Sequence, residues 1–174
     1  MPRANVNEKP FEQVRFENAK IIFKHFNGAR DDFHAEGKRD FCIEIDEATA
    51  KDLADKGVAV KPLTSRDPDE EPKYYVKVRI NWGQDANGRK FGPRVWMYTD
   101  KVKRPLTDAN VGILDDAWIE NADVVTHIYR RHTQGKDTAT LYTDILHVMT
   151  KESTREDPFA AKYAQYDDPD ECPF

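Results

Sequence analysis

The chain has 174 residues, of which 39% are hydrophobic and 34% charged, and its formal net charge is -5. This length suits one domain with extensions and is sufficient for a hydrophobic core. No apolar run is long enough to span a bilayer, and the first residues lack a signal-peptide core, so we expect a cytoplasmic protein. Cys42 and Cys172 give no zinc spacing and make a structural disulfide unexpected.

The negative charge is concentrated at the C-terminal end. Residues 151–174 carry three basic and seven acidic side chains, whereas residues 1–150 carry 24 basic and 25 acidic ones. The net charge therefore does not exclude a nucleic-acid ligand, because the pattern of charge over the body decides binding. We expect one domain over residues 1–150, followed by a flexible linker and acidic tail over residues 151–174.

Two strands and a helix are predicted in the first third of the chain. Alternating apolar residues predict strands over 14–27 and 39–45, the second with Phe41, Ile43 and Ile45 facing the core. One face of the first strand mixes cations with apolar groups, namely Lys20, Ile22, Lys24 and Phe26. Asp46 can cap a helix over 47–56, which Gly57 can close. A short strand at 58–61 and an exposed loop at 62–72 follow.

The strand predicted over residues 73–82 separates apolar from cationic side chains. Its second face carries Lys73, Tyr75, Lys77, Arg79 and Asn81. Cations beside an aromatic ring suit a single nucleic-acid strand, because the cations can contact phosphates while the ring stacks on a base. The alternative is the ordinary solvated face of an antiparallel strand.

A glycine-rich loop at 83–93 precedes a second cationic and aromatic segment. Arg94, Trp96 and Tyr98 alternate there with Val95 and Met97. If the two aliphatic side chains point into the core, a tryptophan and a tyrosine are left exposed, which usually marks a binding surface. The competing interpretation is a strand that is covered on both faces.

A short helix and a long hairpin are predicted at the end of the body. Thr107 and Asp108 can cap the helix, which should end near residue 117. Strands over 121–132 and 138–150 flank a turn that contains Gly135. His127 and His147 could face each other across this hairpin, but two imidazoles without a third ligand do not make a metal site, so none is predicted.

These elements predict a mainly β protein with one or two short helices. Strands do not alternate with helices, so nothing argues for a parallel sheet. A closed or nearly closed antiparallel β-barrel of the OB-fold type accounts for the order, and this fold binds oligonucleotides on its sheet face and loops. The acidic C-terminal tail has too little apolar area to fold alone, so we expect it to be disordered.

The chain ends in an acidic run followed by proline and phenylalanine. This end resembles the C-terminal tip of bacterial-type single-stranded DNA-binding proteins. The resemblance implies that the tip docks replication, recombination and repair proteins, with the terminal aromatic ring as the anchor. The partner-binding residues that it implies are Asp167, Asp168, Asp170, Glu171, Pro173 and Phe174. A solvated acidic terminus without a partner is the alternative.

The body is similar to single-stranded DNA-binding proteins encoded by bacteriophages. The similarity lies in residues 39–43, the segment around Pro93, residues 106–108 and residues 119–123. It implies a non-enzymatic protein of a phage or mobile element, working without a cofactor in the cytoplasm of a bacterial host cell. Such a protein coats and protects single-stranded DNA during replication, recombination or repair. Assembly into a homo-oligomer is left open.

The predicted DNA-binding residues fall into two chemical groups. The residues expected to stack on bases are Phe26, Tyr75, Trp96 and Tyr98. Those expected to contact phosphates are Lys20, Lys24, Lys77, Arg79 and Arg94.

Two other classes of protein remain open. One is an interaction protein that docks on host replication factors through the Phe174 tail without binding DNA. The other is a nuclease or recombination enzyme that uses Asp115 and Asp116 or the acid-rich loop after Pro62. For the enzyme, no supporting histidine, lysine or third carboxylate stands at a diagnostic spacing.

Overall fold

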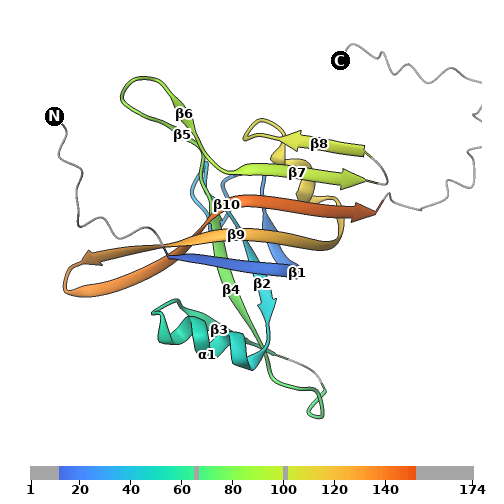
Figure 1. Ribbon diagram of the computed structural model, residues 1–174, viewed down its shortest axis with the longest axis vertical. Coiled ribbons are helices and arrows are strands. Elements are labelled where there is room, and N and C mark those ends of the chain that lie inside the picture. The colour runs from blue at the N-terminus through green and yellow to red at the C-terminus, as the bar shows by residue number, and fades with distance from the viewer. Residues whose placement is uncertain (1–11, 65–66, 100–101, 152–174) are drawn as a thin grey trace, which may run out of the picture.

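The computed structural model describes residues 12–64, 67–99 and 102–151, and Figure 1 shows the arrangement of their elements. The strands are β1 (Gln13–His25), β2 (Arg39–Ile45), β3 (Val60–Leu63), β4 (Lys73–Ile80), β5 (Gly83–Gln84), β6 (Lys90–Phe91), β7 (Arg94–Thr99), β8 (Val102–Leu106), β9 (Trp118–Thr133) and β10 (Lys136–Lys151). The α-helix is α1 (Glu47–Asp55), and η1 (Val111–Asp115) is a short 3₁₀ helix.

Five strands close into a barrel in the order β4, β2, β1, β9 and β10. Strand β1 pairs antiparallel with both β2 and β9. The ring closes where β10 pairs with β4, with Leu141 opposite Val78 and Tyr142 opposite Arg79. The predicted mainly β barrel with short helices is confirmed.

The sheet continues beyond the barrel on the far side of β10. Strand β7 pairs with β10 from Ile145 to Thr150, and β8 pairs antiparallel with β7. Both the β4 and the β7 pairings of β10 are parallel, so the prediction of a purely antiparallel sheet is wrong. The physical reason is the hairpin β5–β6, which returns the chain to the end of β4 and lets β7 continue along β10 in the same direction.

Aliphatic and aromatic side chains from all five barrel strands fill the interior. The predicted inward residues Phe41, Ile43 and Ile45 are buried, as are Val76 and Val78 of β4. Alternation along β2 and β4 therefore predicted the buried face correctly, because each of these strands stays regular along its length.

Strand β1 departs from regular alternation at two bulges. Asn18 and Phe23 have left-handed φ angles of 50° and 49°, and the register of β1 shifts beside each of them. Because a bulge adds one residue, it exchanges the faces of the residues that follow. Phe23 is therefore 60% exposed, whereas Phe26 is 0% exposed and packs on Phe41 with ring centres 5.3 Å apart. The prediction that Phe26 stacks on bases is wrong.

The hairpin β9–β10 forms a long arm that extends past the barrel (Figure 1). The two strands pair from Trp118 opposite Lys151 to Thr133 opposite Lys136, so the arm is longer than predicted. Gln134 and Gly135 make the turn with φ angles of 53° and 76°. Positive φ at both positions fits a type I′ turn, whose twist matches that of the strands.

Helix α1 supports one side of the hairpin arm. As predicted, Asp46 caps the helix by accepting a hydrogen bond from the backbone N–H of Thr49 at 2.8 Å. Gly57 follows with a φ of 87°, which a glycine adopts without strain. Arg130 of β9 donates a hydrogen bond from Nη1 to the carbonyl oxygen of Lys56 at 2.7 Å, which ties the arm to the end of the helix.

The glycine-rich segment forms the small hairpin β5–β6 instead of the predicted loop, and it projects from the barrel in Figure 1. Two contacts between rings and glycines fix its base. The Phe91 ring lies against Gly83 and the Trp82 ring against Gly92, so close that a Cβ at either glycine would collide with the ring.

None of the helices in the described ranges has the length and apolarity needed to cross a membrane. Strand β10 ends at Lys151, next to the domain boundary predicted at residue 150. Residues 152–174, and with them the predicted partner-binding residues of the tail, lie outside the described residues.

Candidate nucleic-acid interface

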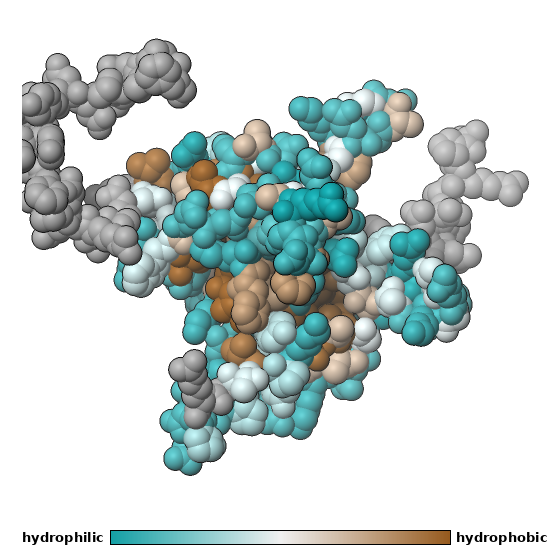
Figure 2. Space-filling view, turned by 180° about the vertical axis from the view of Figure 1, so that it is seen from behind, coloured by the Kyte–Doolittle hydropathy of each residue, from teal (hydrophilic) through white to brown (hydrophobic). Residues whose placement is uncertain are grey.

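Apolar side chains gather in the centre of one face of the molecule, with hydrophilic side chains around them (Figure 2). The large hydrophobic residues with high exposure in the described ranges are Phe23, Phe33, Phe91, Val102, Trp118, Tyr129 and Met149. Exposed apolar groups that cluster on a folded domain commonly mark an interaction surface. The outer faces of the strands are therefore the candidates for a ligand site.

Aromatic rings form a platform on the outer face of the β7–β10 pair. Trp96 lies beside His147 in the register, and the two rings stack with centres 5.0 Å apart and planes 11° apart. The Tyr98 hydroxyl is 2.9 Å from Nδ1 of His147, and Nζ of Lys103 is 4.8 Å from the centre of the Trp96 ring. We call Trp96, Tyr98, His147 and Lys103 the β7 platform. It combines partly exposed rings with a cation, the two kinds of group that contact bases and phosphates in a bound strand.

The side chains of β7 alternate as the sequence predicts. Val95 is buried and Met97 packs against the core, while Trp96 and Tyr98 are half-buried on the opposite face. Arg94 is exposed on the same strand. The strand is therefore neither fully covered on both faces nor left with fully exposed rings.

A second group of rings lies along the hairpin β9–β10. Tyr142 is opposite His127, with ring centres 5.9 Å apart, and Tyr129 meets Tyr142 edge to face at the same distance. The register shift between Thr143 and Ile145 changes the alternation of β10. It puts Tyr142 on the same outer face as the β7 platform.

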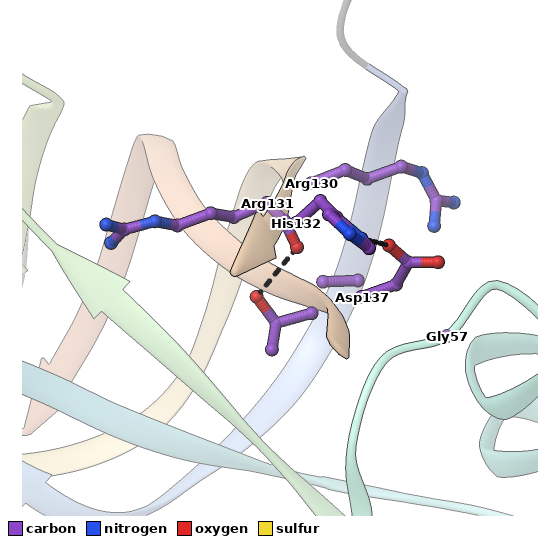
Figure 3. Close-up of a pocket in the computed structure, with 7 residues that line it drawn as sticks. Gly57, Arg130, Arg131, His132 and Asp137 are labelled. Carbon is purple, nitrogen blue, oxygen red and sulfur yellow. Dashed lines mark hydrogen bonds and ion pairs between the residues drawn. The ribbon is translucent and has the colours of Figure 1, made fainter. Parts of the chain in front are cut away.

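Neighbouring arginines leave the hairpin on opposite sides. Figure 3 shows Arg130 and Arg131 pointing away from each other on β9, with His132 bonded to Asp137 across the arm. Residues two apart on a strand share a face, so Arg131 lies on the side of Tyr129. A cation thus accompanies the hairpin rings, as Lys103 accompanies the β7 platform.

The predicted site residues of β4 lie on another part of the barrel exterior. The Tyr75 ring meets Phe23 of β1 edge to face, with centres 5.2 Å apart. Lys77 is exposed, with its Nζ 4.0 Å from Asp40. Arg79 is exposed next to Tyr142 in the pairing that closes the barrel, so it connects the β4 face with the hairpin rings.

Acidic groups of β2 partly neutralise this face. Lys20 and Lys73 both reach the carboxylate of Glu44, each at 3.2 Å. Burial raises the pKa of Glu44, but the hydrogen bonds from the two lysines outweigh it and hold this pKa below its usual value. Lys20 is thus exposed but already paired.

Lys24 belongs to the scaffold and not to the exposed cationic surface. Its Nζ donates hydrogen bonds to the carbonyl oxygens of Leu114 and Ala117, at 3.0 and 2.9 Å. The ammonium group thereby binds carbonyls at the end of η1, where a cation is favoured. The prediction that Lys24 contacts a phosphate is therefore wrong.

Asp115 has a structural partner of its own. Its two carboxylate oxygens accept hydrogen bonds from the backbone N–H groups of Phe26 and Asn27, at 2.8 and 2.9 Å. The carboxylate holds the chain after β1 against η1. This contact gives Asp115 a structural role that needs no catalysis. It therefore weakens the interpretation of the protein as a nuclease.

Histidines and aspartates fasten the loop between β1 and β2. The His25 and His34 rings stack with centres 3.8 Å apart, and His34 bonds to Asp31 through Nδ1 at 2.9 Å and to Asp40 through Nε2 at 3.1 Å. Ligand atoms of His25, Asp31 and His34 lie within 4.8 Å of one another, so a metal ion could be considered. The nitrogen lone pairs of two stacked rings run parallel and do not converge on one metal ion. This geometry favours a structural role, in which the two histidines hold the loop in place, over a metal site.

The hydrogen bonds of His34 predict that the stability of the fold depends on pH. Burial lowers the pKa of His34, but its hydrogen bonds to Asp31 and Asp40 outweigh burial and raise this pKa above 6.5. The stabilisation is therefore fully present below about pH 6.5 and is lost as the pH rises through the folded-state pKa. We expect the melting temperature of the wild type to fall over this range more than that of His34→Asn. If the melting temperatures of the wild type and of His34→Asn depend on pH in the same way, His34 does not stabilise the loop through these hydrogen bonds.

His127 and His147 do not face each other. His127 is opposite Tyr142 and bonds to Asp144 at 2.7 Å, whereas His147 is opposite Asp123. The register of the hairpin separates the two imidazoles, so they do not form a metal site together.

The predicted DNA-binding residues did not include His147, Lys103 or the rings of the hairpin. The sequence of β9 contained a signal for the hairpin rings. Ile128 is buried, so alternation places Tyr129 and Arg131 together on the outer face. Tyr142 was harder to place because the bulge in β10 separates it from the alternation that follows.

A closed barrel that carries rings and cations on its outer strands has the features of proteins that bind single-stranded nucleic acid. Comparison of the sequence with protein-family models identifies the family. Residues 3–172 match the model described as "Putative phage ssDNA-binding domain", and the chain belongs to this family. The family supports a single-stranded DNA-binding protein and is consistent with the expected non-enzymatic role.

A solved structure of a phage protein shares this fold. A C-terminal truncation of the single-stranded DNA-binding protein from bacteriophage Enc34 has a TM-score of 0.51 and 12% identity, over 80% of this chain and 86% of that chain. The Enc34 protein in complex with ssDNA has a TM-score of 0.49 and 12% identity, over 80% of this chain and 87% of that chain. A search of curated protein sequences finds no match.

Proposed function

We propose that the chain is a sequence-nonspecific single-stranded DNA-binding protein of the OB type. It would coat and protect DNA during replication, recombination or repair in a phage or mobile element. The observation that carries the proposal is the β7 platform, in which Trp96 is stacked on His147 with Lys103 beside its ring. Stacking tolerates any sequence because every base has a π-face.

The order of the barrel strands supports the OB assignment. An OB fold is a five-stranded Greek-key barrel that binds oligonucleotides on its second and third strands and on the loops after its first and fourth strands. In chain order the barrel strands are β1, β2, β4, β9 and β10. The corresponding loops are residues 26–38 and the tip of the β9–β10 arm.

The proposed DNA surface combines predicted residues with residues that the structure adds. The predicted residues that remain are Lys20, Tyr75, Lys77, Arg79, Arg94, Trp96 and Tyr98. Lys103 and His147 join them through the β7 platform. The cations contribute affinity without reading sequence, since phosphates are the same along any strand.

Titration of tryptophan fluorescence with unlabelled poly-dT at several salt concentrations tests this function. We expect quenching that saturates stoichiometrically and weakens as salt rises, because cations that bind phosphates release counterions. No quenching, together with no retardation in a gel shift, would overturn the proposal. It would favour an interaction protein that docks on host factors through its tail alone.

Lys77 and Lys24 should differ in their effect on the salt dependence of DNA binding. Lys77→Met should reduce the slope of log affinity against log salt by about 0.9, since one phosphate contact is lost. Lys24→Met should leave that slope unchanged and lower the melting temperature, since Lys24 binds carbonyls of the scaffold. Fluorescence anisotropy across a salt series separates the two effects, and an equal loss of slope in both variants would contradict the assignment.

The C-terminal residues 167–174 are proposed to dock replication, recombination or repair proteins. This part of the proposal rests on the acidic run and the terminal Pro-Phe of the sequence. An acidic tail can also occupy the cationic DNA surface, so deletion of residues 167–174 should tighten DNA binding at low salt and abolish partner docking. Binding curves at low and high salt measure the competition. Unchanged affinity at low salt after the deletion would exclude it.

A further inference from the structure

A pocket of about 490 Å³ lies between the hairpin β5–β6 and the hairpin β9–β10. Phe91, Gly92 and Pro93 line it from one hairpin, and Tyr129, Tyr142 and Arg131 line it from the other. None of these residues belongs to the predicted DNA-binding set. The volume falls within the range of about 300–1,000 Å³ that is usual for sites that bind small organic groups.

The wall of this pocket on the side of β5–β6 is held in place. The Phe91 ring is 52% exposed yet lies in contact with Gly83, and the Trp82 ring lies in contact with Gly92. Arg39 also lies over the Trp82 ring, with its guanidinium carbon 5.8 Å from the ring centre. These contacts orient the hairpin and present the Phe91 ring to the pocket without the help of a ligand.

The opposite wall is also aromatic and ordered. Tyr142 is stacked on His127 and meets the Tyr129 ring at 88°, with both pairs of ring centres 5.9 Å apart. His127 is bonded to Asp144 at 2.7 Å, which fixes its imidazole. A flat ring that enters the pocket therefore meets aromatic surfaces from two separate hairpins.

Polar groups in the pocket match the edge of a nucleobase. The Asn81 amide and the Asp144 carboxylate line it and offer both donors and acceptors. Thr143 lines it as well, although its hydroxyl is buried and closed to a ligand. Arg131 adds a cation suited to a phosphate.

We infer that this pocket holds one unstacked nucleobase of the bound strand, with Arg131 on an adjacent phosphate. The inference rests on the proposed function and adds a base site to it, separate from the β7 platform. Both regions share β10, since Tyr142 lines the pocket and His147 belongs to the β7 platform. A strand that crosses the hairpin can thereby place one base in the pocket and another on Trp96.

The test uses the full chain with Phe91→Ala and Tyr129→Ala, two rings exposed enough that their loss should spare the barrel. Tyr129→Ala also leaves the contact between Phe91 and Gly83 in place, so it separates loss of a stacking ring from a shift of the β5–β6 hairpin. Each variant should bind the shortest oligo-dT that saturates the wild type about tenfold more weakly, which is typical for loss of a stacked base. A strand of the same length that contains abasic residues should bind the variants and the wild type almost equally. Trp118→Ala is the matched control, since it removes a ring that is 69% exposed at the start of β9 and outside the pocket, and it should retain the wild-type preference for bases.

Photocrosslinking with 5-iododeoxyuridine in the same oligonucleotide gives an independent readout. Crosslinks to Phe91, Tyr129 or Tyr142, located by mass spectrometry, would support the pocket. If the wild type binds DNA while both variants keep its affinity and crosslinks form only at Trp96 or Tyr98, the pocket is refuted and the proposed function stands. If the wild type does not bind the oligonucleotide, the proposed function fails and the pocket fails with it.

Discussion

Replacing Phe26 by alanine should lower the free energy of unfolding by about 3–5 kcal/mol, the usual cost of removing a buried aromatic side chain. Its ring is fully buried and stacked on Phe41, so truncation leaves a cavity that the surrounding strands cannot fill. Urea unfolding followed by circular dichroism measures this change. At protein concentrations and temperatures where the variant remains folded, its DNA affinity should equal that of the wild type.

Phe33→Ala is the control for this prediction, because it removes the same side chain from a position that is 92% exposed. Its free energy of unfolding should change by no more than about 0.5 kcal/mol. The opposite result, a stable Phe26→Ala protein with weakened DNA binding, would return Phe26 to the DNA surface. It would also mean that the bulge at Phe23 is absent in solution.

Replacing Trp96 by alanine should weaken single-stranded DNA binding by about 1–3 kcal/mol, which corresponds to a factor of about 5 to 150 in Kd. The ring is the largest surface of the β7 platform, and stacking on His147 keeps it in one orientation. Because tryptophan carries no charge, the slope of log affinity against log salt should stay the same. The combination of a weaker Kd and an unchanged slope separates loss of stacking from loss of a phosphate contact.

Trp118→Phe is the matched control for the fluorescence of Trp96. It removes an indole that is 69% exposed and keeps an aromatic ring, so quenching by poly-dT should persist. The titration on Trp96→Ala should lose most of its quenching. If quenching disappears in Trp118→Phe and survives in Trp96→Ala, the DNA surface lies at the start of β9 and not on β7.

Local patterns predicted the elements that local forces determine. Alternation along β2 and β4 identified their buried faces, Asp46 identified the start of α1, and Gly135 identified the turn of the long hairpin. In each case a few adjacent residues contain the whole signal. Trp96 and Tyr98 were predicted to be outside for the same reason, since Val95 and Met97 alternate with them.

The predictions that were wrong concern residues whose positions depend on segments far away in the sequence. The bulges at Asn18 and Phe23 depend on pairing of β1 with β2 and β9, and they moved Phe26 into the core. Lys24 looked like a surface cation until the fold brought Leu114 and Ala117 to its ammonium group. The hairpin pocket was not predictable either, because its two walls come from segments that only the closed barrel brings together.

The pairing that closes the barrel has a consequence for the order of events during synthesis. Val78 meets Leu141 only after the whole arm has been translated, and such non-local pairing is slow because loop entropy is lost before contacts form. Until then the outer edge of β1 and the part of β4 beyond its pairing with β3 have no partner strands, and the apolar face that later becomes the core is exposed. The nascent chain should therefore be most prone to aggregation, and most dependent on chaperones, in the interval between translation of β4 and release of β10 from the ribosome.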